Sequence, residues 1–238
     1  MIREHFEVRE TAVTLISERR FMKFAKDAVF DARSQIEHKI SQDPFFGTTY
    51  EPYRASPNDG IVVKRMCEAS IKAGVGPMAA VAGAIAAYAV ESMAAAGASY
   101  AIADNGGDIA LINDRDVCIG MYADIGGQRL SLRIPPCDHV IGICSSSGSV
   151  GPSVSFGTSE ISTVFSDDTA LADACATALG NSIGDGNEMK GHLERICTID
   201  GVNGCLAYCG RSFAMCGDIP ELVRSDANDH IITKIRFS

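Results

Sequence analysis

The sequence predicts an α+β fold in which helices pack against antiparallel sheets. The first observation is the order of the patterns, with helices first, then several short strands, then a helix and further strands. The second is that turn residues such as Asn113-Asp114 and Gly126-Gly127 join these strands, and strands joined so tightly must be antiparallel. The third is that no repeat or linker divides the chain, so residues 1–238 are expected to form one domain.

The first third of the chain predicts a strand or hairpin followed by two helices. Residues 4–19 alternate in places between apolar and polar side chains, as strands do. Residues 21–40 carry apolar side chains at helical spacing, which predicts an amphipathic helix. Residues 41–60 contain three prolines and therefore read as a loop, and residues 61–73 predict a short helix.

The loop at residues 41–60 is unusual in holding four aromatic side chains: Phe45, Phe46, Tyr50 and Tyr53. We expect these rings to anchor the loop to the body of the protein. The alternative is a lid or a contact between subunits, because exposed apolar patches mark interaction sites. Together with the smooth helix described next, this loop leads us to expect a homo-oligomer.

The stretch from residue 74 to residue 111 organises the chain. Alanine dominates residues 78–96, where Glu91 is the only charge, and this predicts a helix that neighbours can approach closely. Gly97 ends the helix, and a strand at residues 99–103 is followed by the turn Asn105-Gly106-Gly107-Asp108 and a second strand. Alanines stand where a membrane span would have leucines, so we interpret the helix as buried in the core.

The rest of the chain predicts three more short strands, a second small-residue helix and strand-like segments near the C-terminus. The strands are expected at residues 117–121, 129–134 and 140–144, and the helix at residues 167–179.

The amino-acid composition limits the binding partners and the cellular compartment to be expected. Lysine and arginine number 21 against 30 acidic residues, a net charge of −9, so nucleic acid and anionic membrane surfaces are not expected partners. The N-terminus is charged and does not resemble a signal peptide. Nine cysteines without such a signal indicate reduced thiols and a cytoplasmic protein.

Two stretches could carry chemistry. The first is residues 144–151, CSSSGSVG, where hydroxyls and backbone N–H groups could hold a phosphate, although serine and glycine also simply make turns. In the second, Asp173 and Thr177 lie one helical turn apart among alanine, cysteine and leucine. Mg²⁺ would compensate the cost of burying that acid, and the alternative is a side chain bonded to neighbouring backbone.

The motifs in these stretches resemble the ApbE superfamily, the FAD:protein FMN transferases. The resemblance covers roughly residues 74 to 184, and includes Asn105–Asp108, Ser147-Gly148, the run SVSFG at 153–157 and the helix Ala172–Thr177. An uncharacterised branch of the superfamily is the most similar. The resemblance implies a T-fold-like α+β architecture, with antiparallel sheets packed against helices.

The resemblance also implies a site and its ligands. The matching acid and threonine of the transferases bind Mg²⁺ with the help of a backbone carbonyl, which here implies Asp173, Thr177 and the carbonyl of Ile85. A flavin, FAD or FMN, or another small phosphorylated ligand would lie beside two loops. These loops contain Asn105, Gly106, Gly107, Asp108, Ser146, Ser147 and Gly148.

The chain departs from the transferase pattern at two places. Ala86 stands where the transferases carry a lysine, and no histidine occurs between Gly148 and Val164, where they carry a His-Asp-Pro segment. One positioned acid–base group contributes roughly 10²–10⁴ in rate, so flavin transfer itself is not expected to be retained. The expectation is a divergent Mg²⁺-dependent, transferase-like protein.

Two alternatives remain open. The first is a ligand-binding or scaffold protein without catalysis. The second is a thiol-dependent role, because Cys205 and Cys209 share one strand face and the uncharacterised branch has been associated with sulfur assimilation toward homocysteine. Small buried cysteines are the simpler interpretation of that pair, and His139 is expected to be an ordinary surface histidine.

Overall fold

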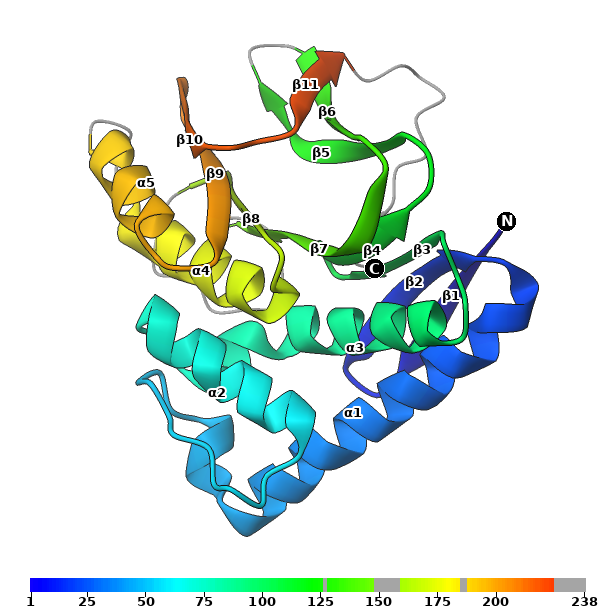
Figure 1. The fold of residues 1–238 in the computed structure, drawn as a ribbon. Coiled ribbons are helices and arrows are strands. Elements are labelled where there is room, and N and C mark those ends of the chain that lie inside the picture. The colour runs from blue at the N-terminus through cyan, green and yellow to red at the C-terminus, as the bar shows by residue number, and fades with distance from the viewer. Residues whose placement is uncertain (126–127, 148–158, 185–187, 225–238) are drawn as a thin grey trace.

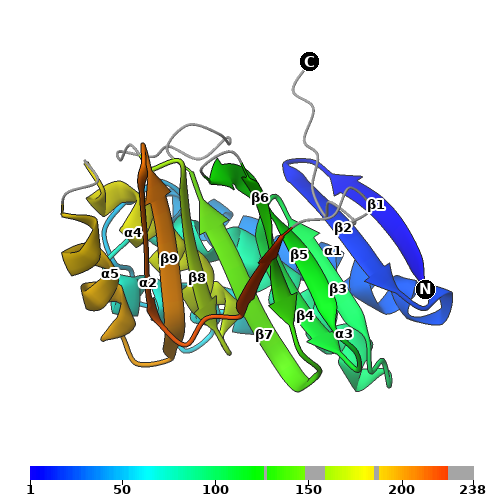
Figure 2. The same cartoon turned by 90° about the horizontal axis from the view of Figure 1, so that it is seen from above.

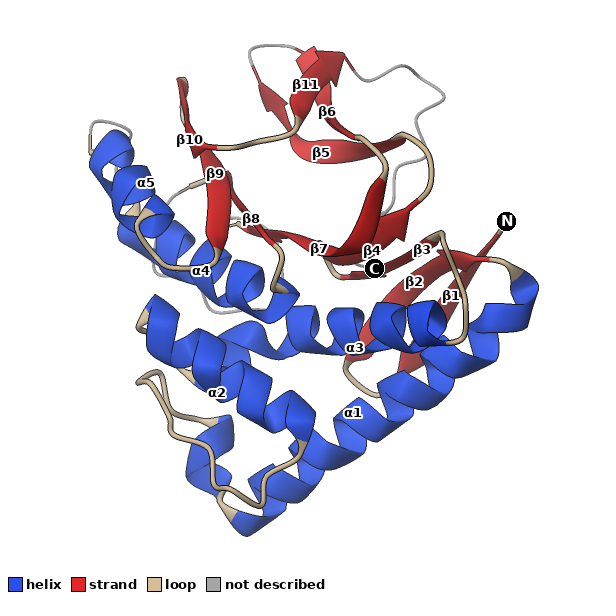
Figure 3. Ribbon diagram, in the orientation of Figure 1, coloured by secondary structure: helices blue, strands red, loops and turns tan. Residues whose placement is uncertain are grey.

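The protein has three layers, in which helices, a large sheet and a small sheet follow one another (Figure 1). The computed structural model describes residues 1–125, 128–147, 159–184 and 188–224. All helices of the described residues lie on one side of the large sheet, and the small sheet lies on its other side (Figure 3). The predicted α+β class with antiparallel sheets is confirmed.

The large sheet has eight strands in the order β1-β2-β3-β4-β7-β8-β9-β10, and every neighbouring pair is antiparallel (Figure 2). Its strands are β1 (Ile2–Val8), β2 (Thr11–Ser17), β3 (Ala101–Asn105), β4 (Asp108–Asn113), β7 (Cys137–Ser146), β8 (Ile161–Ser166), β9 (Val202–Cys209) and β10 (Ser212–Gly217). The predicted hairpin at residues 105–108 joins β3 to β4. The chain order therefore breaks once, between β4 and β7.

The small sheet explains that break. It consists of β5 (Val117–Ile125), β6 (Gln128–Ile134) and β11 (Glu221–Arg224), in the order β11-β6-β5. The strands expected at residues 117–121 and 129–134 do form, but they leave the large sheet and cover its outer face. The turn residues gave no sign of this, because a tight turn fixes the direction of a strand and not the sheet that it joins.

Two apolar cores follow from this arrangement. Along β3, the side chains of Ala101 and Ala103 pack toward the helices, whereas Ile102 packs toward the small sheet with Ile119 and Leu132 of β5 and β6. Successive side chains of a strand point to opposite faces, so a strand covered on both faces is apolar throughout. This is why β3 reads as an uninterrupted buried run.

The helical layer contains five α-helices among the described residues. They are α1 (Met22–Gln42), α2 (Ile61–Ala73), α3 (Val81–Ala95), α4 (Thr169–Ser182) and α5 (Met189–Cys197). The short 3₁₀ turns η1 (Arg19–Phe21), η2 (Pro44–Gly47) and η3 (Pro77–Ala80) precede α1, follow α1 and precede α3. Four of the α-helices match the predicted ones, and α5 is an additional helix that no pattern had indicated.

Helix α3 is the centre of the helical layer. It contacts α1, α4, β3 and β4, and most of its alanines are buried. Together with η3 it is long and apolar enough to cross a membrane by length and composition. Its packing between the sheet and α1 agrees with the interpretation as a core helix (Figure 1).

Two of the four aromatic side chains in the loop after α1 pack against the protein, and the other two are exposed. Phe46 is fully buried and meets Tyr53 edge to face at 5.3 Å, so these two rings do anchor the loop. Phe45 and Tyr50 are 61% and 67% exposed. The expectation of a subunit contact at this loop stays a prediction.

Candidate functional site

The first turn of α4 lies unusually close to both α3 and the large sheet. A Cβ atom on Gly83 of α3 would lie 2.5 Å from the carbonyl oxygen of Thr169, and one on Gly142 of β7 would lie 2.5 Å from the Cα of Thr169. Real Cβ atoms do not approach other atoms so closely, so both positions require glycine. These two contacts set the distance at which Asp173, one turn further along α4, meets its neighbours.

Asp173 caps the N-terminus of α3 from a neighbouring helix. Its Oδ2 accepts a hydrogen bond of 2.8 Å from the backbone N–H of Gly83, and the N–H of Ala82 also donates to this carboxyl group. The first N–H groups of a helix lack partners within the helix and attract negative charge. Asn105 binds the same turn, since its Nδ2 donates to the carbonyl of Ala82 at 3.1 Å.

A second carboxyl group meets Asp173 at this point. The carboxyl groups of Asp108 and Asp173 lie close enough for each to change the pKa of the other. Asp108 begins β4 and pairs with Cys144 of β7 in the sheet register, and the Cys144 thiol contacts its carboxyl group. That thiol is fully buried and lies 3.5 Å from the carbonyl of Thr169.

Burial dominates the electrostatics of Asp108, Asp173 and Cys144. Burial raises the pKa of Asp173 to about 7, against the opposing effect of the Gly83 and Ala82 N–H groups. Burial also raises the pKa of Asp108, and the neighbouring Asp173 raises it further. Burial and both carboxylates raise the pKa of Cys144. Among the described residues, no ion pair involves either carboxyl group, so the proximity of the two acids favours retention of a proton by the pair.

The turn between β3 and β4 is held by Asp104, a residue that the sequence had not singled out. Its Oδ1 accepts from the N–H of Gly107 at 2.9 Å, and burial raises its pKa to about 6. Gly106 and Gly107 both have positive φ, at 75° and 107°. An acid three residues before a glycine in a tight turn was the available signal, because such side chains often accept from turn N–H groups.

The structure places the serine run beside α4. Asp173, Thr177 and Gly180 are four and three residues apart, so they lie on one face of the helix. A Cβ atom on Gly180 would lie 3.2 Å from the Oγ of Ser146, and Ser146 shares a strand face with Cys144. Ser145 joins β7 to the hairpin, because its N–H donates to the carbonyl of Gly107 at 3.2 Å.

The predicted residues are therefore brought together in part. Asp173 and Asn105 both bind the first turn of α3, and Asp108 lies beside Asp173. Ser146 lies further along α4, beside Gly180. Thr177 lies one turn beyond Asp173 and is partly exposed. Ser147 directly follows β7, whereas Gly148 and the run at 153–157 lie outside the described residues. The pairing of Asp108 with Asp173 was not foreseen, because residues 65 apart in the chain reveal no contact in a single sequence.

Ile85 lies on α3, two residues after Gly83. Its side chain is buried in the core and its carbonyl belongs to the second turn of α3, where a helical carbonyl accepts from the residue four positions on. Gly83 and Ala82, which contact Asp173 and Asn105 directly, are the backbone groups of α3 at the site. The ligand set Asp173, Thr177 and Ile85 stays a prediction.

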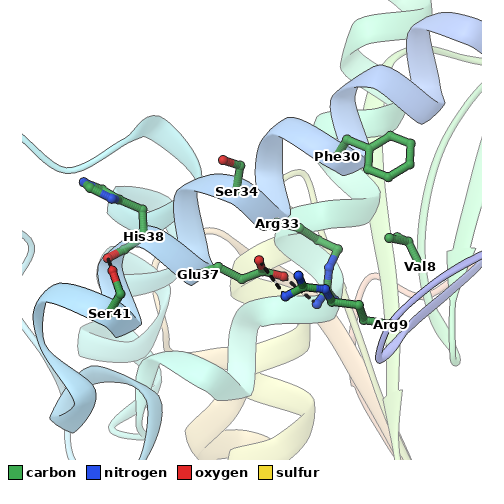
Figure 4. Close-up of a pocket in the computed structure, with 8 residues that line it drawn as sticks. All are labelled: Val8, Arg9, Phe30, Arg33, Ser34, Glu37, His38 and Ser41. Atoms are coloured by element: carbon green, nitrogen blue, oxygen red, sulfur yellow. Dashed lines mark hydrogen bonds and ion pairs between the residues drawn. The ribbon is translucent and has the colours of Figure 1, made fainter.

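A separate hollow lies between the β1–β2 turn and α1 (Figure 4). Its charged side chains are joined to one another, since Glu37 pairs with Arg33 and with Arg9 at 2.9 Å each. It contains no predicted site residue.

The C-terminal thiols pair differently from the prediction. The Sγ atom of Cys205 lies 3.5 Å from that of Cys197 on α5, and Cys216 stands opposite Cys205 on β10. Cys209 is at the far end of β9 and is partly exposed. Burial raises the pKa of Cys197 to about 11, which favours the interpretation of these cysteines as neutral packing residues.

Comparison with known proteins agrees with this architecture. Residues 3–193 match the family model described as AbpE bacteria. A UPF0280 protein of Methanocella arvoryzae is 46% identical over 230 residues, covering 96% of this chain and 94% of the relative. A UPF0280 protein of Methanosarcina acetivorans is also 46% identical, covering 98% of this chain and 93% of the relative.

Solved structures show the same fold at low sequence identity. The flavin transferase ApbE from Vibrio cholerae superposes with a TM-score of 0.59 at 12% identity, covering 90% of this chain and 96% of that protein. The ApbE protein from Thermotoga maritima superposes with a TM-score of 0.58 at 11% identity, covering 98% and 99%. Identities this low support a shared architecture and leave the chemistry of the site to the residues themselves.

Proposed function

The chain belongs to the family described as AbpE bacteria, and from this premise we propose that it binds a divalent cation between Asp108 and Asp173. The cation, Mg²⁺ in this proposal, in turn holds a small phosphorylated ligand, with FAD and FMN as the leading candidates. The observation that carries the proposal is the proximity of a second acid, Asp108, to the buried carboxyl group of Asp173, with no basic side chain paired to either among the described residues. Burying a second acid against the first is unfavourable unless a proton or a cation compensates the charge.

The surrounding residues suit such a cation. Carboxylate oxygens and neutral oxygens are the ligands that Mg²⁺ prefers, and it commonly keeps positions for water or phosphate oxygens. Thr177, one turn after Asp173 on the same face, offers a hydroxyl. Ser146 and Ser147, with the backbone of the Asn105–Asp108 turn, would contact the phosphorylated part of the ligand. The name of the relative from Vibrio cholerae, a flavin transferase, supports flavin as the first ligand to test.

Transfer of a flavin to a protein is not part of the proposal. The position of the transferase lysine is Ala86, which is fully buried in α3. The thiol-dependent alternative has less support than the cation site, because burial raises the pKa of Cys144, and raises that of Cys175 to about 12. Neutral, enclosed thiols are poor nucleophiles. A binding protein without turnover remains compatible with every feature of the site.

The test is a titration of the purified chain with FAD, FMN and ATP, with and without Mg²⁺, followed by flavin fluorescence and calorimetry. We expect Mg²⁺ to strengthen binding of at least one of these nucleotides by about 10-fold or more, the usual range for coupled ligands. Asp173→Asn should abolish the effect of Mg²⁺ while keeping an oxygen that can accept from Gly83. Asp108→Asn and Thr177→Ala should weaken it.

Asp200→Asn is the matched control, since that side chain is fully exposed. Absence of nucleotide binding in the presence of Mg²⁺ would contradict the proposal. So would a Mg²⁺ effect that is the same in Asp173→Asn and in the wild-type protein.

A further inference from the structure

Three consecutive residues at the start of β7 place a thiol, a carboxylate and an imidazole together. The Sγ of Cys137 lies 3.2 Å from Nδ1 of His139, and Oδ1 of Asp138 lies 3.2 Å from the same nitrogen. One potential ligand atom from each residue lies within 4.8 Å of the other two. Cys137 and His139 are two residues apart, so they share one face of the strand.

These spacings match the edges of a small coordination tetrahedron. Zinc binds sulfur at about 2.3 Å and nitrogen or carboxylate oxygen at about 2.0–2.2 Å, so its ligand atoms lie roughly 3.3–3.7 Å from one another. The sulfur–nitrogen and oxygen–nitrogen distances here are 3.2 Å without any ion between the groups. The Sγ atom also lies 3.5 Å from Nε2, so the exposed imidazole must rotate to direct Nδ1 at an ion held by the thiolate.

The second nitrogen of the imidazole already has a carboxylate partner. Nε2 of His139 lies 3.5 Å from Oδ1 of Asp167, which follows β8. That same oxygen accepts from Nδ2 of Asn203 on β9 at 2.9 Å, so the carboxylate is held in place. A histidine that binds a metal almost always donates its other N–H to a carboxylate, a carbonyl or a water.

We propose that Cys137, Asp138 and His139 bind a divalent cation of the Zn²⁺ type, with Asp167 as a positioning residue that orients His139. Sulfur, nitrogen and oxygen donors together select such borderline-soft ions, whereas Mg²⁺ requires oxygen ligands. Three protein ligands leave a fourth position for water or a small ligand. Residues 137 and 144 are separated by roughly 23 Å along an extended strand, so this site is independent of the one at Asp108 and Asp173.

The test is titration of the full chain with Co²⁺ in a non-chelating reductant, recording the thiolate-to-cobalt charge-transfer band in the near ultraviolet. We expect the charge-transfer band to saturate with one Co²⁺ per chain, and this Co²⁺ to be displaced by Zn²⁺ and not by Mg²⁺. Cys137→Ser should remove the band and His139→Ala should remove tight binding. Asp167→Asn should weaken Co²⁺ binding by about 10–100-fold, the usual cost of losing a carboxylate partner of a ligating histidine.

Cys118→Ser is the control, because Cys118 is an exposed thiol on β5 outside the cluster. A missing band, a band unchanged in Cys137→Ser, or one lost equally in Cys118→Ser would overturn the proposal. Rapid alkylation of Cys137 that depends on His139, without a cobalt band, would also overturn it and assign an activated thiol instead. Asp173→Asn should keep the band, so failure of one cation site is distinguishable from failure of the other.

Discussion

Two aspartates in this protein lose water on folding but have partners of opposite charge. Asp59, in the loop between α1 and α2, binds Lys39 of α1 at 2.9 Å, and the two side chains are only 8% and 9% exposed. Asp173, on α4, meets a second acid, Asp108. Both acids lose water on folding, but only the first gains an opposite charge.

The direction of each pKa shift follows from the charge of the neighbouring side chain. Burial works to raise the pKa of Asp59, yet the hydrogen bond from Lys39 and the backbone N–H of Ser56 outweigh it, and the pKa is lowered. For Asp173 burial prevails and the pKa is raised. The charges of Lys39 and Asp59 balance each other, and this pair fixes a loop. Asp108 and Asp173 reach charge balance only with a proton or a bound cation. A carboxyl group left in that state at neutral pH is typical of functional sites.

Removing the ammonium group of Lys39 from its pair with Asp59 should produce the largest loss of stability. In Lys39→Ala, Asp59 would keep a buried charge without a partner, and breaking such a pair costs about 3–5 kcal/mol of unfolding free energy. The rings of Tyr53 and Phe46, which lie 5.1 and 6.0 Å from the ammonium group, would lose a contact as well. Urea unfolding followed by circular dichroism measures the loss.

The exposed pair between Lys23 and Asp27 is the control, and Lys23→Ala should change stability little. A double variant, Lys39→Met with Asp59→Leu, should recover most of the loss, because an apolar pair removes the uncompensated charge. If Lys39→Ala is no less stable than Lys23→Ala, the pair is not the anchor of the loop.

The second prediction tests how Asp173 is positioned. In Gly83→Ala the new Cβ would meet the Thr169 carbonyl and the Cβ of Asp173, which lies 2.8 Å away. Forcing α3 and α4 apart should cost about 2–3 kcal/mol, in the upper range for overpacking. Unfolding in urea gives the stability, and the Mg²⁺ dependence of nucleotide binding should weaken as well.

Gly191 is the matched control for that substitution. It also lies in a helix, α5, but nothing would contact a Cβ there within 4 Å. Gly191→Ala should therefore stabilise the protein by about 0.5–1 kcal/mol. Equal effects at the two positions would show that close packing at Gly83 does not set the position of Asp173.

The local elements of this fold could be predicted from the sequence, because their signals are local. Helix α2 has the predicted bounds, residues 61–73, and Asp168 caps α4 by accepting from the N–H groups of Ala170 and Leu171. The transfer of β5 and β6 to a second sheet could not be predicted. Which sheet a hairpin joins depends on the apolar face it covers, and that face exists only after the large sheet has formed.

The sequence indicated several residues of the site but not the contacts between them. Asp173 was notable because an acid among alanines needs a partner, and that argument required only its neighbours in the chain. Its actual partners, the N–H of Gly83 and the carboxyl of Asp108, are 90 and 65 residues away. The contacts depend on two glycines whose roles are steric, and a missing side chain leaves no chemical signature in a sequence.

The third prediction uses pH to distinguish Asp59 from Asp173. In the metal-free protein, the pKa of Asp173 is about 7 when folded, against 3.8 as its ordinary value. Between these two values the folded state holds more protons than the unfolded state, so stability falls as pH rises. The contribution of Asp173 to stability should therefore decline steadily as pH rises from about 4 to about 7. Asp59 has the opposite sign, because its lowered pKa gives stability that is lost as pH falls below its ordinary value.

The difference in unfolding free energy between the wild-type protein and Asp173→Asn isolates this contribution from all other titrating groups. Measured in urea with a chelator present, that difference should move against the wild-type protein as pH rises to about 7 and then stay constant. Adding Mg²⁺ should reverse the trend in the wild-type protein alone, because a cation that replaces the shared proton binds more tightly once that proton has left. A difference that does not change with pH would mean that Asp173 is already ionised in the fold. The contrast with Asp59 would then lie in packing alone.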